Sequence, residues 1–254
     1  MALSIGIVGL PNVGKSTLFN ALLKQQVALA ANYPFATIDP NVGIAQVPDD
    51  RLAVLAPIVH TSVIKPATVE FVDIAGLVKG ASTGEGLGNQ FLSHIRETSA
   101  ICHVLRGFSD PDVIREGSVG PKEDLETIRT ELQLADLATV TKQPEPKGAV
   151  KPEVHKRYEA VVTFRTALNS GQMINTLDLS DDEKVVAKEL NLLTAKPEIF
   201  AVNVDEGELG VKSAPSSVAE IARMLAVDPT SVVVISAKIE SELSSLGEED
   251  QKCY

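Results

Sequence analysis

The chain has 254 residues, 44% of them hydrophobic, which is enough for a globular domain with a full core and an insertion or small second domain. Its 34 acidic residues outnumber the 23 basic ones, and the formal net charge of -11 disfavours non-specific binding to nucleic acids. Aromatic residues make up only 4% of the chain and none is Trp, which argues against recognition by stacking on bases.

No part of the sequence has the pattern of a targeting or membrane segment. The N-terminus carries no positively charged stretch, and no apolar run approaches the roughly 18 residues that a membrane-spanning helix needs. Cys102 and Cys253 lie far apart and in no metal-ligand spacing, as is typical of a reducing compartment. We expect a cytoplasmic protein with no membrane partner. Nothing in the sequence fixes the oligomeric state, and a monomer is the default expectation.

A strand, a glycine-rich loop and a helix open the chain. Residues 3–8 are nearly all apolar, and a helical pattern runs from Lys15 to about Lys24. The sequence Gly9-Leu10-Pro11-Asn12-Val13-Gly14-Lys15-Ser16-Thr17 matches the Walker A pattern, in which backbone N–H groups surround the β-phosphate, the lysine pairs with the β- and γ-phosphates and the hydroxyl binds Mg²⁺. We predict that Lys15 is catalytic and Ser16 is a metal ligand. The predicted nucleotide-binding residues of this loop are Pro11, Asn12, Val13, Gly14, Lys15, Ser16 and Thr17.

Residues 32–41 form a loop-like stretch rich in turn residues. This stretch contains Thr37 at a place where GTPase-type folds carry a threonine that binds Mg²⁺ and moves between nucleotide states. We predict Thr37 as a metal ligand and catalytic residue; an ordinary turn threonine is the alternative.

A second apolar strand, residues 68–72, runs into Asp73-Ile74-Ala75-Gly76. An aspartate at the end of a strand, in a chain with a Walker A loop, is typical of the acid that holds Mg²⁺ directly or through water. We predict Asp73 as a metal ligand and Gly76 as a catalytic residue that senses the γ-phosphate. Residues 79–88 are too rich in glycine for regular structure and predict a mobile switch, with a flexible surface loop as the alternative.

Further apolar runs of strand length occur at residues 100–105, 199–203 and 231–235, with helical patterns between several of them. This alternation predicts an α/β fold with a doubly wound, mostly parallel sheet.

Residues 121–196 interrupt that alternation and show only helical periodicity. The Pro-rich residues 143–148 separate two helices and predict an inserted antiparallel helical hairpin. A third helix is predicted to begin at Ser180, with Glu183 completing a capping box. The predicted domains are 1–120 and 197–254, the two parts of a P-loop domain, with 121–196 as the insertion. The residues that carry the helical pattern are Leu125, Ile128, Leu132 and Ala135, then Val154, Tyr158, Val161, Arg165 and Leu168.

The segment after the strand at 199–202 bears on the choice of base. GTPases of this type recognise guanine with Asn-Lys-x-Asp, whose aspartate accepts hydrogen bonds from guanine N1–H and the 2-amino group. Here the segment is Asn203-Val204-Asp205-Glu206, so the lysine and the terminal aspartate are both replaced. We predict that ATP binds at least as tightly as GTP; a retained GTPase is the alternative. The predicted base-site residues are Asn203, Val204, Glu206, Ser236, Ala237 and Lys238.

Three stretches together resemble the YchF subfamily of Obg-like ATPases: the Walker A segment 9–17, the Asn-Tyr-Pro-Phe and Ile-Asp-Pro-Asn tetrads within 32–41, and residues 73–82. The resemblance spans nearly the whole chain. It implies a GTPase-type domain with a coiled-coil-like insertion, hydrolysis of ATP in preference to GTP, and association with ribosomes. That family also carries a C-terminal TGS domain, which has no counterpart after Leu246, so the resemblance implies that a longer version of the protein exists; natural loss of that domain is the alternative.

Two departures from related proteins concern catalysis. Leu77 stands where Ras-like GTPases place a glutamine that orients water, and a leucine cannot hydrogen-bond a water, so slow intrinsic turnover is expected. The family often offers a histidine after the fourth strand, but residues 112–117 contain none. His94 and His103 are expected to be packing or surface residues. Asn12 suggests a K⁺ ion as a possible second cofactor, with a simple turn role as the alternative.

Three functions are compatible with these residues. The first is a slow, Mg²⁺-dependent ATPase that acts as a ribosome-associated switch, and the second is a regulatory module whose hydrolysis is incidental. The third is contact with ribosomal RNA through the tip of the hairpin, where basic residues are in local excess; solvated helix ends are the alternative explanation. These basic residues are Lys142, Lys147, Lys151, Lys156 and Arg157.

Overall fold

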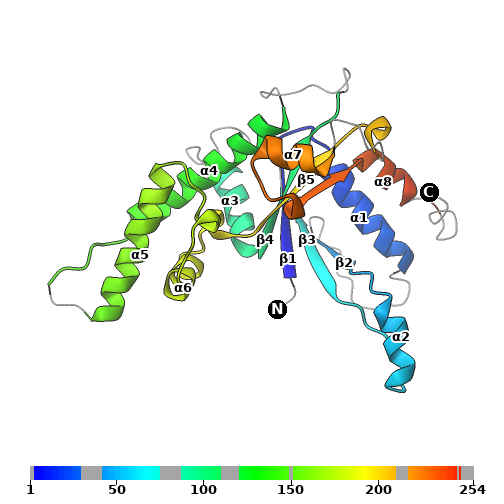
Figure 1. Ribbon diagram of the computed structural model, residues 1–254, viewed down its shortest axis with the longest axis horizontal. Helices are drawn as coiled ribbons and strands as arrows, with labels where there is room; N and C mark the ends of the chain where they lie inside the picture. The colour runs from blue at the N-terminus through cyan, green and yellow to red at the C-terminus, as the bar shows by residue number, and fades with distance from the viewer. Residues whose placement is uncertain are drawn as a thin grey trace.

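The computed structural model describes residues 3–29, 42–74, 87–109, 120–148, 151–209, 217–244 and 246. A six-stranded sheet with the order β2-β3-β1-β4-β5-β6 forms its centre (Figure 1). All neighbouring strands are parallel except β2 and β3, so the predicted doubly wound, mostly parallel α/β sheet is confirmed. The strands are β1 (Leu3–Val8), β2 (Val42–Gln46), β3 (Thr68–Asp73), β4 (Ala100–Arg106), β5 (Glu198–Asn203) and β6 (Val232–Ile235).

The inner strands carry the clearest sequence signal because they are covered on both faces. Every residue of β4 is buried, and β1 is buried from Ile5 onward, which explains their continuous apolar runs. The edge strand β2 lacks such a run, since Gly43 is its one buried residue. A Cβ atom at Gly43 would lie 2.0 Å from Leu23 Cδ2, so this glycine allows α1 to pack closely against the edge strand.

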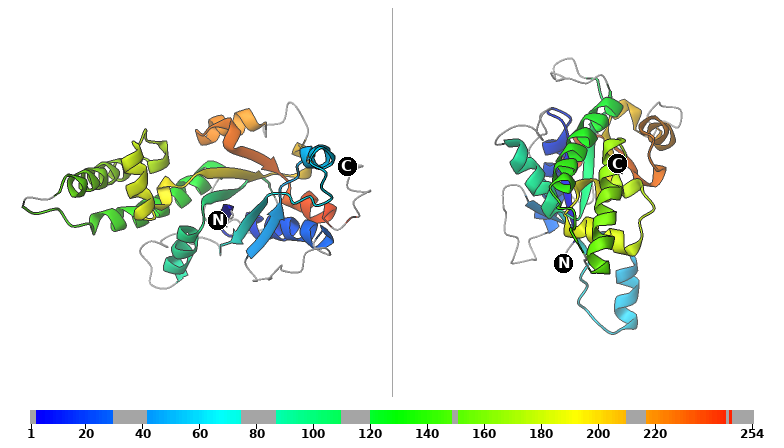
Figure 2. Two further views of the ribbon diagram at one scale, coloured as in Figure 1. Left: turned by 90° about the horizontal axis from the view of Figure 1, so that it is seen from below. Right: turned by 90° about the vertical axis from the view of Figure 1, so that its left-hand side faces the viewer.

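Helices flank the sheet on both faces (Figure 2). Helix α1 packs against α8 and against β1, β2 and β3, whereas α4 contacts β4 and α7. One helix, α2, projects from the edge of the molecule instead of covering the sheet (Figure 1). These helices are α1 (Lys15–Leu29), α2 (Arg51–Ile58), α3 (Leu87–Glu97), α4 (Pro121–Thr141), α7 (Val218–Leu225) and α8 (Ala237–Leu243).

The predicted helices of the 121–196 segment are all present: α4 and α5 (Pro152–Asn169) pack against each other, and α6 (Asp181–Glu189) packs against α5. Pro121 and Pro152 begin the first two of these helices, where a missing N–H is tolerated. The capping box of α6 is confirmed, because the Ser180 hydroxyl accepts the Glu183 N–H and the Glu183 carboxylate accepts the Ser180 N–H.

Helix α4 takes part in two hydrophobic cores. Ile128 and Leu132 pack into the main core beneath the sheet, whereas Val140, which lies about two turns beyond Leu132, packs into a separate core with Phe164 and Val186. The helical insertion therefore has a core of its own at the end that is distant from the sheet.

A buried carboxylate fastens α4 to the chain that enters β5. Asp136 is fully buried and accepts hydrogen bonds from the backbone N–H of Leu193 (3.0 Å) and of Thr194 (2.8 Å) and from the Thr194 hydroxyl (2.7 Å). Burial raises the pKa of the Asp136 carboxyl, although these hydrogen bonds oppose the rise. Within the described residues, no helix combines the length and the apolar character that crossing a bilayer requires.

Candidate nucleotide-binding site

The loop between β1 and α1 turns through two residues with left-handed backbone, Asn12 (φ 62°) and Gly14 (φ 93°). A Cβ atom on Gly14 would lie 2.3 Å from Asn203 Nδ2, and one on Gly9 would lie 2.8 Å from the Val104 carbonyl oxygen. Both positions therefore require glycine, and asparagine tolerates the left-handed conformation better than most residues. The left-handed φ is sufficient to explain the asparagine at position 12.

Lys15 and Ser16 begin α1 and face the end of β3. The Lys15 ammonium forms an ion pair with Asp73 Oδ1, and Ser16 Oγ lies 3.4 Å from Asp73 Oδ2. Lys15 is 8% exposed and the Asp73 side chain 16%. The structure thus brings three of the predicted site residues together at the carboxyl ends of parallel strands, where α/β proteins bind ligands.

The donor set at this point suits Mg²⁺. A serine hydroxyl and an aspartate carboxylate are hard oxygen ligands, and Mg²⁺ in nucleotide sites is typically held by one or two such groups together with phosphate oxygens and water. In the part of the chain that the structure describes, there is no group of three or more His, Cys, Asp or Glu side chains placed to hold a metal ion. Ser16 and Asp73 fit a metal ion that is also held by the phosphate oxygens of a nucleotide.

Asn203 connects the loop to the last helix. Its side-chain amide donates to the Val13 carbonyl oxygen (3.0 Å), and its side-chain oxygen accepts the N–H of Ala237 (2.9 Å). Asn203 is 6% exposed, so both ends of its amide are committed to the protein. This asparagine holds the loop and the start of α8 at a fixed separation.

A cavity of about 710 Å³ opens beside the loop, a size that suits a small-molecule ligand. It brings together three segments that the sequence predicts as parts of one site: the loop, the residues after β5 and the residues after β6. Of the predicted residues, those that line it are Asn12, Gly14, Thr17, Asn203, Val204, Glu206, Ser236, Ala237 and Lys238.

The residues that replace the guanine-reading motif differ sharply in environment. Val204 is 4% exposed and packs into a hydrophobic cluster with Leu105 and Val202, while also lining the cavity. The Asp205 carboxylate accepts the N–H of Ser109 at 3.1 Å. Glu206 is exposed and begins a short 3₁₀ helix (Glu206–Glu208). None of these three described residues places a buried carboxylate in the cavity.

Phe108 also lines this cavity, and the sequence reasoning does not single it out. The Arg106 guanidinium lies 4.4 Å from the centre of its ring, and Arg106 Nε donates to the Phe108 carbonyl oxygen at 3.4 Å. One signal in the sequence could have pointed to Phe108: it is an aromatic residue two positions after a central strand, in a chain with few aromatic residues. The ring gives the cavity a flat apolar wall.

Several predicted site residues lie outside the described residues. These are Thr37, predicted as a metal ligand, Gly76, predicted to sense the γ-phosphate, Leu77, the segment 112–117, and residues 79–86 of the predicted switch. Their roles stay predictions. The last two residues of that switch, Leu87 and Gly88, begin α3, so the prediction of irregular structure was wrong for them.

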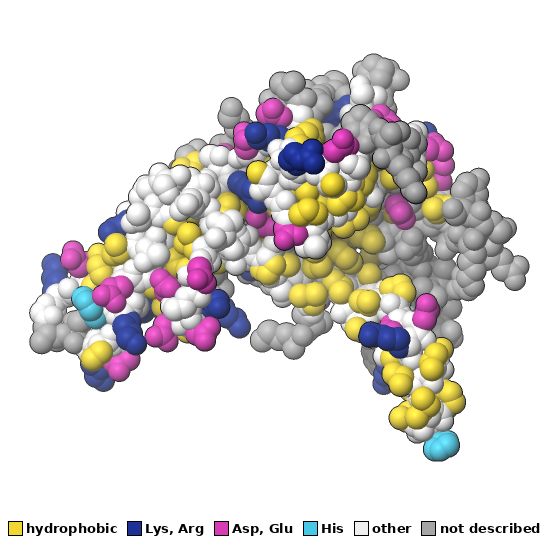
Figure 3. All heavy atoms as spheres, in the orientation of Figure 1, with side chains coloured by type: hydrophobic (Ala, Val, Ile, Leu, Met, Phe, Trp, Pro, Cys, Tyr) yellow, Lys and Arg dark blue, Asp and Glu magenta, His cyan; other side chains and the backbone are white. Residues whose placement is uncertain are grey.

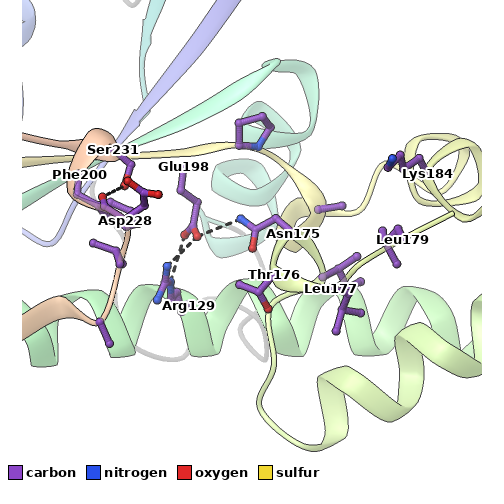
Figure 4. A pocket seen from close by; sticks show the side chains of 15 residues that line it. Arg129, Asn175, Thr176, Leu177, Leu179, Lys184, Glu198, Phe200, Asp228 and Ser231 are labelled. Atoms are coloured by element: carbon purple, nitrogen blue, oxygen red, sulfur yellow. Dashed lines mark hydrogen bonds and ion pairs between the residues drawn. The ribbon is translucent and has the colours of Figure 1, made fainter. Parts of the chain in front are cut away.

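A second cavity, of about 720 Å³, lies at the other end of β5 (Figure 4). Glu198 accepts hydrogen bonds there from Arg129 (2.8 Å) and Asn175 (3.1 Å), and its Oε1 is hydrogen-bonded to His103 Nε2 at 2.8 Å. The His103 ring is fully buried and stacks on Phe200 with ring centres 5.3 Å apart. His103 is thus a packing residue, as expected, and this cluster joins β4, β5 and α4.

The basic residues near the hairpin tip fall into two groups, and all are exposed except Arg157, which is half-buried. Lys156 lies 3.4 Å from the Asp182 carboxylate, and Arg157 is 3.1 Å from that of Glu189, so both charges are balanced by α6. Lys142, Lys147 and Lys151 form no ion pair with a described residue. The unbalanced positive charge is therefore concentrated in the connection between α4 and α5.

The sheet order, the loop after β1 and the aspartate at the end of β3 define a P-loop protein of the GTPase fold. Residues 4–142 match the family described as 50S ribosome-binding GTPase. The ribosome-binding ATPase YchF of Bacillus subtilis is 48% identical over 99% of this chain and 70% of its own length, and that of Escherichia coli O157:H7 is 46% identical over 99% and 69%. The solved structure of the Schizosaccharomyces pombe YchF GTPase, 37% identical, superposes with a TM-score of 0.81 over 98% of this chain and 69% of that one. The chain belongs to the YchF family.

Proposed function

We propose that this chain is a slow, Mg²⁺-dependent ATPase whose nucleotide state controls its association with the ribosome. The observation that carries the proposal is the meeting of Lys15, Ser16 and Asp73 beside a cavity whose base-side residues offer no buried carboxylate to guanine. Relatives with nearly half of their residues in common are named ribosome-binding ATPases, which favours both parts of the proposal. A cytoplasmic location, with the ribosomes, belongs to the same proposal.

In this proposal the nucleotide domain consists of residues 1–120 and 197–254, and the segment 121–196 is an insertion. Lys15 balances charge on the β- and γ-phosphates, and Ser16 and Asp73 hold Mg²⁺ together with Thr37. The bound metal supplies further charge neutralisation at the phosphates. Gly76 meets the γ-phosphate, and Leu77 contributes no group that positions water, so turnover without a partner is slow.

A single experiment separates this function from a regulatory module whose hydrolysis is incidental. Phosphate release is followed over many turnovers with and without ribosomes, with Lys15→Ala as the inactive control. We expect the unmodified chain to release phosphate slowly and ribosomes to change the rate. The Lys15→Ala variant should release none. Release no faster than that of the control, with ribosomes present, would favour the regulatory module.

The choice of base is tested by competition between ATP and GTP in Mg²⁺ buffer. ATP should bind at least as tightly as GTP, because Glu206, which replaces the guanine-reading aspartate, is exposed and has an extra methylene that displaces its carboxylate from guanine N1–H and the 2-amino group. A tenfold preference for GTP would overturn the assignment. Glu206→Asp is the practical gain-of-GTP variant, since Glu206 is exposed, whereas Val204→Lys would place an ammonium at a buried position and needs a parallel check of folding.

Contact with ribosomal RNA is proposed for the connection between α4 and α5. The double variant Lys147→Glu/Lys151→Glu should weaken co-sedimentation with ribosomes in a salt-dependent way, because it reverses the unbalanced charge at the tip. Lys122→Glu is the matched control, since Lys122 is a 54% exposed lysine at the opposite end of α4. Equal pelleting of both variants would remove the RNA contact from the proposal.

A role for K⁺ is a separate part of the proposal, suggested by Asn12 at the edge of the cavity. If a K⁺ ion adds positive charge at the phosphates, hydrolysis is faster in K⁺ than in Na⁺ buffer. Equal rates in the two buffers would leave Asn12 with its turn role alone.

A further inference from the structure

The last residue of β4 is a buried cation. On the face of the molecule seen in Figure 3, Lys and Arg side chains lie on the surface as dark blue groups, whereas Arg106 is 4% exposed. Withdrawing a guanidinium from water is costly unless the protein provides it with partners, so a buried arginine indicates a specific task. Two of its contacts are made with one residue, Phe108, which lines the nucleotide cavity.

Arg106 contacts both the ring and the backbone of Phe108. The centre of the Phe108 ring lies 4.4 Å from the carbon of the Arg106 guanidinium, and the Phe108 carbonyl oxygen accepts a hydrogen bond from Arg106 Nε at 3.4 Å. A cation within about 6 Å of a ring centre is attracted to the face of that ring. One guanidinium therefore sets the position of the Phe108 backbone and the orientation of its ring.

The turn that carries Phe108 starts from a fixed point. Arg106 is paired in register with Asn203 of β5, and the N–H of Gly107 donates to the Asn203 carbonyl oxygen at 2.8 Å. A Cβ atom at Gly107 would lie 3.0 Å from Val202 Cγ1, so little room is left between the turn and β5. The end of β4 is thus held against the strand that leads into the base-side residues of the cavity.

Apolar packing does not fix the Phe108 ring. Phe108 is half-buried and belongs to none of the hydrophobic cores that the described residues form. Phe200 provides the contrast, because it also lies near a guanidinium, that of Arg129 at 5.3 Å, but is 2% exposed and packs into a core. Packing holds Phe200 in place, whereas Phe108 depends on its cation.

We infer that Arg106 is a positioning residue for the nucleotide: it holds the Phe108 ring so that the uncovered face of the ring stacks on the base. The inference rests on the proposed function, since it takes the cavity beside the loop as the ATP site. The guanidinium covers one face of the ring, and stacking on the opposite face requires that this face is presented in one orientation. Arg106 therefore acts on the base end of the nucleotide, and the phosphates bind without its help.

Calorimetric titration with two probes in Mg²⁺ buffer tests the role of Arg106. The probes are ATP and inorganic triphosphate, which has the phosphates but no base. Arg106→Met should weaken ATP binding about two- to thirtyfold, the range expected for the loss of one contact between a cation and a ring, and should leave the affinity for triphosphate unchanged. Arg106→Lys, which keeps a cation, should lose less. In steady-state hydrolysis, Arg106→Met should raise KM for ATP more than it lowers kcat.

Arg129→Met is the matched control, because it removes a guanidinium from the ring of Phe200, beside the other cavity, and should leave ATP affinity unchanged. Equal losses for ATP and triphosphate in Arg106→Met would show a general effect on the loop or the fold and would overturn the inference. The same holds if the unmodified chain binds triphosphate as tightly as ATP, because the base then contributes nothing. A chain that binds neither probe would instead contradict the proposed function.

A double-mutant cycle shows whether Arg106 acts through the ring. Phe108→Ala should weaken ATP binding on its own, and adding Arg106→Met to it should cost no further affinity, because the ring that the guanidinium positions is already gone. Phe108→Leu keeps an apolar side chain without a ring and should resemble Arg106→Met, so the test remains possible if Arg106→Met does not fold. Losses that multiply in the double variant, or unchanged ATP affinity in Phe108→Leu, would rule out the positioning role.

Discussion

At the scale of single residues, Asn203 braces the loop between β1 and α1. Its amide joins Val13 to Ala237 from a buried position, and it lies so close to Gly14 that no side chain fits between them. The sequence predicts Asn203 as a residue of the base site, and the structure adds a second role, as a brace of the loop. Because both ends of its amide bind backbone groups, the geometry favours the brace.

Replacing Asn203 by alanine should weaken nucleotide binding tenfold or more and lower the free energy of unfolding by about 1–3 kcal/mol. Both effects have one cause, since the Val13 carbonyl and the Ala237 N–H lose their partner inside the protein. Calorimetric titration with ATP and urea unfolding measure the two effects. Asn175→Ala is the control, because Asn175 also bonds with its amide, but at the far end of β5; unchanged ATP affinity in Asn203→Ala would contradict the brace.

At the scale of elements, β5 links the two polar centres of the molecule. The strand begins at Glu198, which binds α4 through Arg129 and β4 through His103, and it ends at Asn203. The Glu198 carboxylate is ionised in this setting. Burial alone would raise the pKa of Glu198, but hydrogen bonds and charge from His103 and Arg129 lower it to about 2 from its ordinary value of 4.5.

This lowered pKa predicts how stability responds to acid. The stabilising contribution of Glu198 is complete above pH 4.5 and is lost as the pH falls from 4.5 towards about 2, because the unfolded chain takes up the proton first. Glu198→Gln should therefore be less stable than the unmodified chain at pH 7, with a difference that narrows below pH 4. Thermal unfolding between pH 3 and 7 measures this, and Glu159→Gln, at a 64% exposed side chain on α5, is the control. A constant difference across that range would contradict the lowered pKa.

At the scale of the whole molecule, the helical insertion has a core that the sheet does not share. Phe164 is fully buried in that core, while Ile128 on α4 is fully buried in the core of the sheet. We expect Phe164→Ala to loosen the insertion, at a cost of about 3–5 kcal/mol, and to change ATP affinity less than twofold. Ile128→Ala should lower both stability and ATP affinity. Hydrogen exchange of α5 and ATP titration measure the two effects; a tenfold loss of ATP affinity in Phe164→Ala would show that the two cores are coupled.

The sequence predicts those parts of the fold in which burial leaves a periodic pattern. The inner strands and the helices of the insertion were predicted, although the pattern was wrong at two positions of α5: Val154 is 43% exposed, and Phe164 is buried where the pattern put Arg165. The edge strand β2 and helix α2 were not, because both are short and each has a single buried residue. Phe108 and the Glu198 cluster depend on contacts between distant segments, and no local pattern in the sequence reports such contacts.

If Lys15 binds phosphate and Asp73 binds Mg²⁺, as proposed, the ion pair between them should make the binding of the two ligands mutually dependent. A triphosphate alone would draw Lys15 away and leave the Asp73 carboxylate unbalanced beside the phosphates, and Mg²⁺ alone would do the same to Lys15. Only the two ligands together restore the balance of charge, so each should raise the affinity for the other by the same factor, within the roughly 5–150-fold range of such couplings. Titration of ATP with and without Mg²⁺ measures the factor, and Asp73→Asn should reduce it towards one. The ion pair would thus keep the site self-neutralised, so that neither ATP alone nor Mg²⁺ alone is expected to open it efficiently.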